Sequence, residues 1–100
     1  MHIIIKTRLV DFWNQHPDAQ PSLRLWFKRV RSSRWRNFNE LRKSFPSADS
    51  VKNLTVFNVG GNKYRLITLV DCKYQKVFIR AVLTHAEYDK EGWKNDSWFK

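Results

Sequence analysis

The sequence predicts an α+β domain in which an N-terminal strand and two to three helices pack on one face of a C-terminal antiparallel β-meander. A short β-branched run opens the chain at residues 2–5, and helical periodicity follows it. The second half contains three runs rich in Val, Ile, Leu, Thr and aromatic residues, separated by turn signals. One hundred residues can build one core, so we expect a single domain spanning residues 1–100.

The helices are predicted from apolar residues that recur with the 3.6-residue period. The first runs from residue 7 to about residue 16, the second begins at residue 21, and the third covers residues 39–44. The first should end before Pro17 and the third before Pro46, because proline and the residue before it disfavour helical geometry. Their expected buried residues are Leu9, Phe12, Trp13, Leu23, Trp26, Phe27, Val30, Phe38, Leu41 and Phe45.

Turn signals divide the second half of the chain into strands. Residues 47–50 are predicted to form a loop, and residues 71–75 a looser connection between the last two strands. Gly60-Gly61 is predicted to be a two-residue hairpin turn, because a type I′ turn needs positive φ at both central positions. Such a turn would place Val59 opposite Asn62 in the neighbouring strand.

Alternation along these strands predicts which face each side chain occupies. The face that packs on the helices is expected to carry Tyr64, Leu66, Val70, Val77, Ile79, Ala81 and Leu83. The opposite face is expected to carry Asn58, Lys63, Arg65, Phe78, Arg80, Val82 and Thr84. A sheet face with two arginines and a lysine is a place where a phosphate backbone could lie.

The charge of the chain favours a polyanionic partner. Nineteen Lys and Arg against nine Asp and Glu give a formal charge of +10, spread over both halves, and nucleic acid is the leading candidate. We expect no membrane binding, because no segment combines a basic face with a continuous apolar one. The lone Cys72 forms no internal disulfide and favours a reducing, cytoplasmic location.

Motifs of metal and cofactor enzymes are missing from the sequence. The chain has no phosphate-binding G-x-x-x-x-G-K-[ST], no G-x-S-x-G and no H-E-x-x-H. Its acidic residues are scattered through a cationic chain rather than grouped as ligands. We therefore expect no metal site and no cofactor.

Two segments resemble the HigB branch of the RelE-like toxins of type II toxin-antitoxin systems. They are FNVGGNKYRLIT at residues 57–68 and IRAVLTHAEYD at residues 79–89. The resemblance implies a RelE-like fold and an endoribonuclease that cuts mRNA, typically on the ribosome, and so inhibits translation. It also implies a HigA-like helix-turn-helix antitoxin, through which alone the toxin would contact operator DNA. The family pattern falls on Asn58, Gly60, Gly61, Asn62, Arg65, Arg80, Thr84, His85, Tyr88 and Asp89.

Metal-free RNA cleavage suggests a role for each candidate. It requires a deprotonated 2′-hydroxyl, a stabilised phosphate charge and a protonated leaving oxygen. Arg65 and Arg80 suit the phosphate, because a guanidinium is permanently charged and binds phosphate in two-point fashion. His85 is the candidate for proton transfer, and Tyr88 could assist it or stack on a base. The candidate RNA-binding residues are Asn58, Asn62, Lys63 and Thr84.

Each of these interpretations has an alternative. A non-catalytic RNA- or ribosome-binding module would explain the charge, the aromatics and the arginines without His85. A toxin of the same fold could instead poison DNA gyrase. The eight basic residues between positions 24 and 43 are typical of a solvated helix face. Trp93, Trp98 and Phe99 are expected to close the core or dock the tail rather than to stack on bases.

Overall fold

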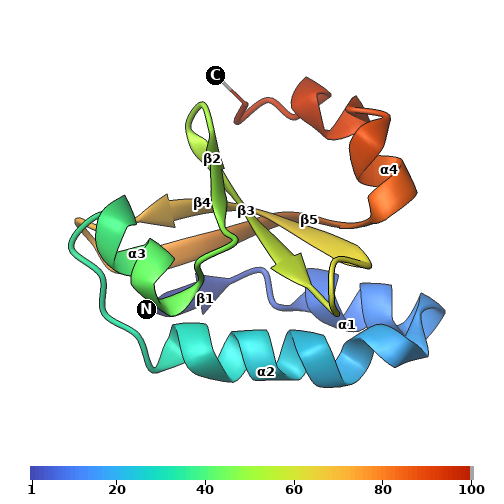
Figure 1. Cartoon of the computed structure of the whole chain (residues 1–100), viewed down its shortest axis with the longest axis horizontal. Coiled ribbons are helices and arrows are strands. Elements are labelled where there is room, and N and C mark those ends of the chain that lie inside the picture. Colours follow the sequence, from blue (N-terminus) through green and yellow to red (C-terminus); the bar gives the residue numbers. More distant parts are fainter. Residues whose placement is uncertain (100) are drawn as a thin grey trace.

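The chain forms one mixed five-stranded sheet with helices on one side, as the computed structural model of residues 1–99 shows (Figure 1). Its strands are β1 (His2–Ile4), β2 (Asp49–Val51), β3 (Leu54–Val59), β4 (Tyr64–Asp71) and β5 (Lys76–Thr84). Their order is β1-β5-β4-β3-β2, in which β1 runs parallel to β5 and the other neighbours are antiparallel. The predicted α+β class and the meander β3-β4-β5 are confirmed.

Two helices cover one face of this sheet. They are α1 (Thr7–Gln15) and α2 (Gln20–Arg31), joined by a 3-10 turn at Pro17–Ala19, and they lie below the sheet in Figure 1. The shorter α3 (Phe38–Ser44) begins at Asn37, whose side chain accepts a hydrogen bond from the main-chain N–H of Glu40. None of the helices in residues 1–99 is long and apolar enough to cross a membrane.

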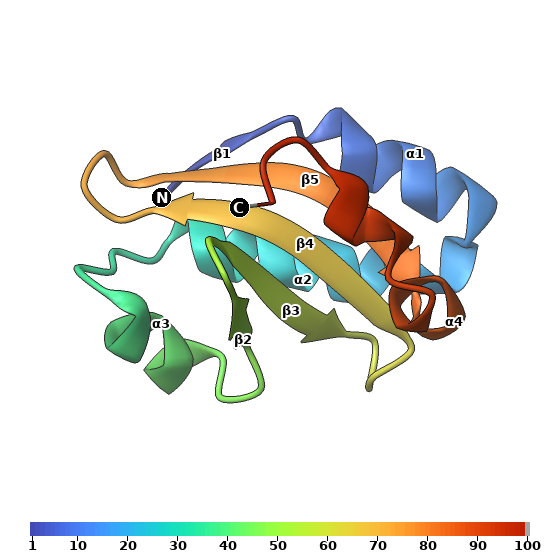
Figure 2. The ribbon, with the colours of Figure 1, turned by 90° about the horizontal axis from the view of Figure 1, so that it is seen from above.

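The opposite face, which we call the outer face, is covered by the C-terminal part of the chain. This part contains α4 (His85–Asp89) and a 3-10 turn at Gly92–Asn95, and it lies over β4 and β5 when seen from above (Figure 2). Helix α4 was not predicted from the sequence. The feature of the sequence that indicates this helix is the Thr-x-x-Glu pattern at Thr84 and Glu87, which forms a capping box at the start of α4.

The core therefore has two parts. The larger part lies between the helices and the sheet and includes Leu9, Leu23, Trp26, Val30, Phe57, Leu66, Val77 and Ile79. The smaller part lies on the outer face and includes Leu54, Val56, Ile67 and Trp93, with Leu69, Ala81, Leu83, Tyr88, Trp98 and Phe99 packed against it. The C-terminal aromatics thus close a core, as the sequence analysis expected.

The hairpin between β3 and β4 differs from its prediction. Val59 pairs with Tyr64 rather than with Asn62, so the loop has four residues instead of two. Gly60, Gly61 and Asn62 all have positive φ, at 63°, 61° and 73°. Asn tolerates this conformation, which lets the turn continue one residue beyond the glycines. A two-residue register shift keeps the faces of both strands unchanged, so Arg65 still lies on the outer face.

A bulge reverses the predicted faces in the last part of β5. Ile67 pairs with Ala81 and Thr68 with Ile79, so Arg80 is the extra residue. The helix-side face was predicted to carry Ala81 and Leu83, which instead pack in the outer-face cluster. Val82 was predicted on the outer face and packs in the helix-side cluster.

Two predictions for residues near the sheet ends also need correction. Residues 49 and 50 were predicted to be loop, but they belong to β2, which pairs with β3. Lys63 was predicted on the strand face and lies in the turn, where its Nζ is 3.7 Å from the carboxylate of Asp18.

Candidate functional site

Arg65 is the central cation of the candidate site. It lies in β4 opposite Asn58 of β3, close to the hairpin end of the sheet. Its Nη1 donates hydrogen bonds to the main-chain oxygens of Asn62, at 2.9 Å, and Tyr64, at 3.2 Å. The guanidinium carbon lies 5.5 Å from the centre of the Tyr88 ring. These contacts hold the charge of Arg65 on the outer face beside an aromatic ring from α4.

The N-terminus of α4 brings the candidate proton-transfer residue to the same end of the sheet. The Thr84 hydroxyl accepts from the Glu87 N–H, and the Glu87 carboxylate accepts from the Thr84 N–H. The main-chain N–H of His85 donates to the carbonyl of Lys63 at 3.0 Å, which ties α4 to the hairpin loop. The helix is therefore anchored at its first residue to the turn next to Arg65.

His85 has a carboxylate partner on its own helix. Its Nδ1 lies 3.0 Å from Oδ2 of Asp89, and 53% of the His85 side chain and 62% of the Asp89 side chain are exposed. This pairing orients the ring through Nδ1 and leaves Nε2 for contacts outside the helix. A carboxylate that orients an exposed imidazole is a usual arrangement for general acid–base chemistry.

Tyr88 stands between Arg65 and the C-terminal segment. Its ring stacks on Trp93, with centroids 5.2 Å apart and planes 9° apart. Burial raises the pKa of the Tyr88 hydroxyl above its usual value, and the nearby Asp49 carboxylate adds to the rise. Tyr88 therefore keeps its proton at neutral pH and can donate it in a hydrogen bond.

A hollow of about 340 Å³ adjoins Arg65 and Tyr88. Its lining includes Asn58 from β3, Asp49 from β2 and Arg42 from α3. Arg42 was not among the predicted site residues, because its basic segment is typical of a solvated helix face. Nothing in the local sequence separates it from its neighbours, since only the packing of α3 beside the sheet brings it to the hollow.

The other predicted RNA-binding residues surround this end of the sheet. The carbonyl of Asn62 accepts from Arg65, so the turn shapes the guanidinium position through its main chain. Lys63 is an exposed cation at the loop, and Thr84 uses its hydroxyl to cap α4. Asn58 is the one of these four predicted residues that lines the hollow.

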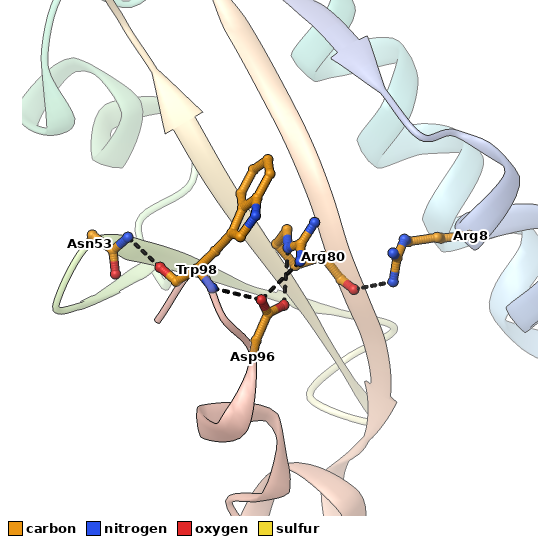
Figure 3. A network of polar contacts seen from close by, with 5 residues as sticks. All are labelled: Arg8, Asn53, Arg80, Asp96 and Trp98. Atoms are coloured by element: carbon orange, nitrogen blue, oxygen red, sulfur yellow. Dashed lines mark hydrogen bonds and ion pairs between the residues drawn. The ribbon is translucent and has the colours of Figure 1, made fainter. Parts of the chain in front are cut away.

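Arg80 lies in a different environment on the same face. Its Nε and Nη2 donate to the two carboxylate oxygens of Asp96, at 3.0 Å and 2.8 Å, and the guanidinium carbon lies 3.9 Å from the Trp98 ring centre (Figure 3). The hydrogen bond from Arg80 lowers the pKa of Asp96 below its usual value. The structure thus brings Arg65, His85 and Tyr88 to one end of the sheet, and it places Arg80 in an ion pair with the C-terminal segment.

Comparison with known proteins identifies a family. Residues 19–91 match the model of the HigB toxin family, described as the RelE-like toxic component of a toxin-antitoxin system. The chain is 36% identical over 92 residues to the mRNA interferase toxin HigB of Escherichia coli K12. The aligned residues make up 89% of this chain and 88% of the relative. The mRNA interferase HigB of Shigella flexneri gives the same values. A third relative, the mRNA interferase HigB of Escherichia coli O6:H1, is 29% identical over 93 residues, 90% of each chain. The chain therefore belongs to the HigB family of RelE-like toxins.

Proposed function

We propose that this chain is an mRNA endoribonuclease that acts as the toxin of a type II toxin-antitoxin system and cleaves RNA without a metal ion. The observation that carries the proposal is that the Arg65–Tyr88 contact and the His85–Asp89 pair lie at the same end of the sheet, where the His85 N–H donates to the carbonyl of Lys63 in the hairpin loop. A cation that could bind a phosphate, a protonated phenol and an oriented imidazole would then serve the same RNA. The names of the relatives, mRNA interferase HigB, support the same activity.

The reaction is an attack of the 2′-oxygen on the adjacent phosphorus. The O2′–P bond forms and the P–O5′ bond breaks, which leaves a 2′,3′-cyclic phosphate and a 5′-hydroxyl. Arg65 stabilises the negative charge that develops on the phosphate oxygens. His85 either takes the proton of the 2′-hydroxyl or gives one to the departing 5′-oxygen, and Tyr88 donates a hydrogen bond or stacks on a base.

Further residues complete the proposed RNA site. Asn58 is placed to hydrogen bond a nucleotide in the hollow, and Lys63 adds positive charge at the loop. Asn62 and Thr84 act beside it, the former by positioning Arg65 and the latter by positioning His85. The phosphate contact that guanidinium chemistry suggested for Arg80 is not part of this proposed site, because Arg80 is paired with Asp96.

The partners follow from the family and the charge. We propose a HigA-like helix-turn-helix antitoxin that neutralises the toxin and carries any contact with operator DNA. We also propose that the chain acts in the cytoplasm on mRNA bound to the ribosome. The net charge of +10 supports approach to such an RNA-rich surface.

Single substitutions of the candidate residues test the proposal. His85→Ala should lower the rate of RNA cleavage by roughly 10²–10⁴-fold, the usual size of a general acid–base contribution. RNA affinity should stay near the wild-type value, because the histidine contributes no fixed charge. Arg65→Ala should lower both cleavage and affinity. The readouts are cleavage of a labelled RNA oligonucleotide in EDTA, fluorescence anisotropy for binding, and chemical analysis of the product ends.

Several outcomes would contradict this assignment. Intact cleavage by His85→Ala would show that another group transfers the proton. RNA binding by the wild type without cleavage, on free RNA and on translating ribosomes, would favour a non-catalytic module. Growth arrest with DNA breaks and uncut transcripts would favour a gyrase poison.

A further inference from the structure

Asp96 makes the ion pair that attaches the C-terminal segment, residues 92–99, to the outer face. The Asp96 carboxylate accepts two hydrogen bonds from Arg80 and one from the main-chain N–H of Trp98, at 2.8 Å. Only 14% of the Arg80 side chain and 17% of the Asp96 side chain are exposed. An ion pair with so little solvent contact and three hydrogen bonds is stronger and less screened by salt than a surface pair.

Aromatic residues cover this ion pair. The Trp98 ring lies against the Arg80 guanidinium and meets Phe78 of β5 edge to face, with centroids 5.4 Å apart. Figure 3 shows the side chain of Asn53 directed at the main chain of Trp98, to which its Nδ2 donates. The β2–β3 turn and β5 therefore both hold the segment in place.

A chain of contacts leads from Asp96 to the candidate site. The main-chain N–H of Asp96 donates to the carbonyl of Trp93 at 3.1 Å, which closes the 3-10 turn that carries Trp93. Trp93 is 9% exposed, stacks on Tyr88 and donates from Nε1 to the Tyr88 carbonyl at 3.1 Å. Tyr88 in turn lies against Arg65.

We propose that Asp96 is a positioning residue for RNA cleavage, which acts by clamping Arg80 and, through Trp93, by holding the Tyr88 ring beside Arg65. This inference rests on the proposed endoribonuclease function. It gives Arg80 a role at a distance from the RNA, because Asp96 occupies the Nε and Nη2 edge of its guanidinium and only 14% of the Arg80 side chain is exposed. Small displacements of catalytic groups cost large factors in rate, so a loosened segment should slow the chemical step.

A double-mutant cycle tests the proposal. Asp96→Asn and Arg80→Gln should each lower kcat by about 10-fold with little change in KM, because both release the same clamp. The double variant should also lose about 10-fold, whereas independent contributions would multiply to about 100-fold. Glu91→Gln is the matched control. It removes a carboxylate that lies directly before the C-terminal segment and that pairs with Lys94 rather than with Arg80. It should cleave RNA at the wild-type rate.

A spectroscopic readout separates positioning from general loss of stability. The indole N–H resonance of Trp93, assigned through Trp93→Phe, should shift and exchange faster with solvent in Asp96→Asn but not in Glu91→Gln. Circular dichroism and thermal unfolding should show that each variant is folded at the assay temperature. Asp96→Glu, which keeps the charge, should recover part of the lost rate.

Three results would overturn the proposal. One is a fall in kcat of the double variant that equals the product of the two single falls, which would mean that Arg80 contacts RNA itself. Another is wild-type cleavage by Asp96→Asn, and the third is an unchanged Trp93 resonance in that variant. A wild-type protein that cuts no RNA would overturn the proposed function as well, so the two failures are distinguishable.

Discussion

Arg65 and Arg80 are the same residue type on the same sheet face, yet their surroundings differ. Arg65 bonds main-chain oxygens of its own hairpin and faces an aromatic ring beside a hollow. Arg80 is neutralised by the carboxylate of Asp96, sixteen residues later in the chain. A guanidinium edge that is hydrogen-bonded to a carboxylate is not available to a phosphate, so we assign phosphate binding to Arg65 rather than to Arg80.

The Asp96 carboxylate should make stability depend on pH in the acid range. Hydrogen bonding by Arg80 lowers the native pKa of Asp96, while the unfolded chain titrates near its usual value of about 4. The stabilisation is therefore complete above about pH 4 and is lost as pH falls through the lowered native pKa. Urea unfolding should show Asp96→Asn less stable than wild type at pH 7, with the difference shrinking toward pH 2. A difference that grew on acidification would contradict this.

At the scale of elements, the hairpin loop between β3 and β4 determines where Arg65 and α4 meet. Its carbonyls accept from the Arg65 guanidinium at one residue and from the His85 N–H at the next. Three successive residues with positive φ turn those carbonyls toward the site. The glycines are therefore part of the geometry of the site and not simply a way to reverse the chain.

Alanine substitutions distinguish the two glycines. Both have positive φ, so each Gly→Ala change should cost about 1–2 kcal/mol of stability. A Cβ at Gly60 would also lie 3.0 Å from the Tyr64 ring, whose hydroxyl is tied to Asp18, whereas a Cβ at Gly61 meets nothing within 4 Å. Gly60→Ala should therefore lose about 1–3 kcal/mol more than Gly61→Ala in chemical denaturation. Equal losses would show that Tyr64 moves aside freely.

At the scale of the whole molecule, the sheet is covered on both faces by different parts of the chain. The helices cover one face, and the C-terminal segment covers part of the other (Figure 2). The region left open lies at the hairpin end, where α3, β3 and α4 surround the hollow. Positive charge is spread over the chain, and we expect the cations that line the hollow to be the ones that contact RNA.

Two neighbouring cations of α3 test whether position or net charge matters. Arg42 lines the hollow and Lys43 does not, and each change to Gln lowers the net charge by one. Arg42→Gln should weaken binding of an RNA oligonucleotide and reduce the log–log salt slope by about 0.7, the loss of one single-strand phosphate contact. Lys43→Gln should leave the slope near the wild-type value. Equal effects would mean that RNA binding depends on overall charge alone.

The sequence alone predicted the fold class, because hydrophobic period, proline positions and turn residues are local signals. The resemblance to the HigB family pointed to residues that lie together in the structure, such as Arg65 and Tyr88. Alternation predicted the wrong faces for the residues after Arg80, since a bulge depends on how two strands pair and is not visible in the sequence of one of them. The turn was placed correctly and its length was not, because Asn62 can share the glycines' conformation.

Only the tertiary structure decided what each site residue contacts. Arg42 reaches the hollow because α3 packs beside the sheet, and Asp96 reaches Arg80 because the C-terminal segment folds back over β5. Both contacts join residues that are distant along the chain, where no periodicity or spacing relates them. Local patterns specify which elements form, whereas the free energy of packing those elements determines which charges meet.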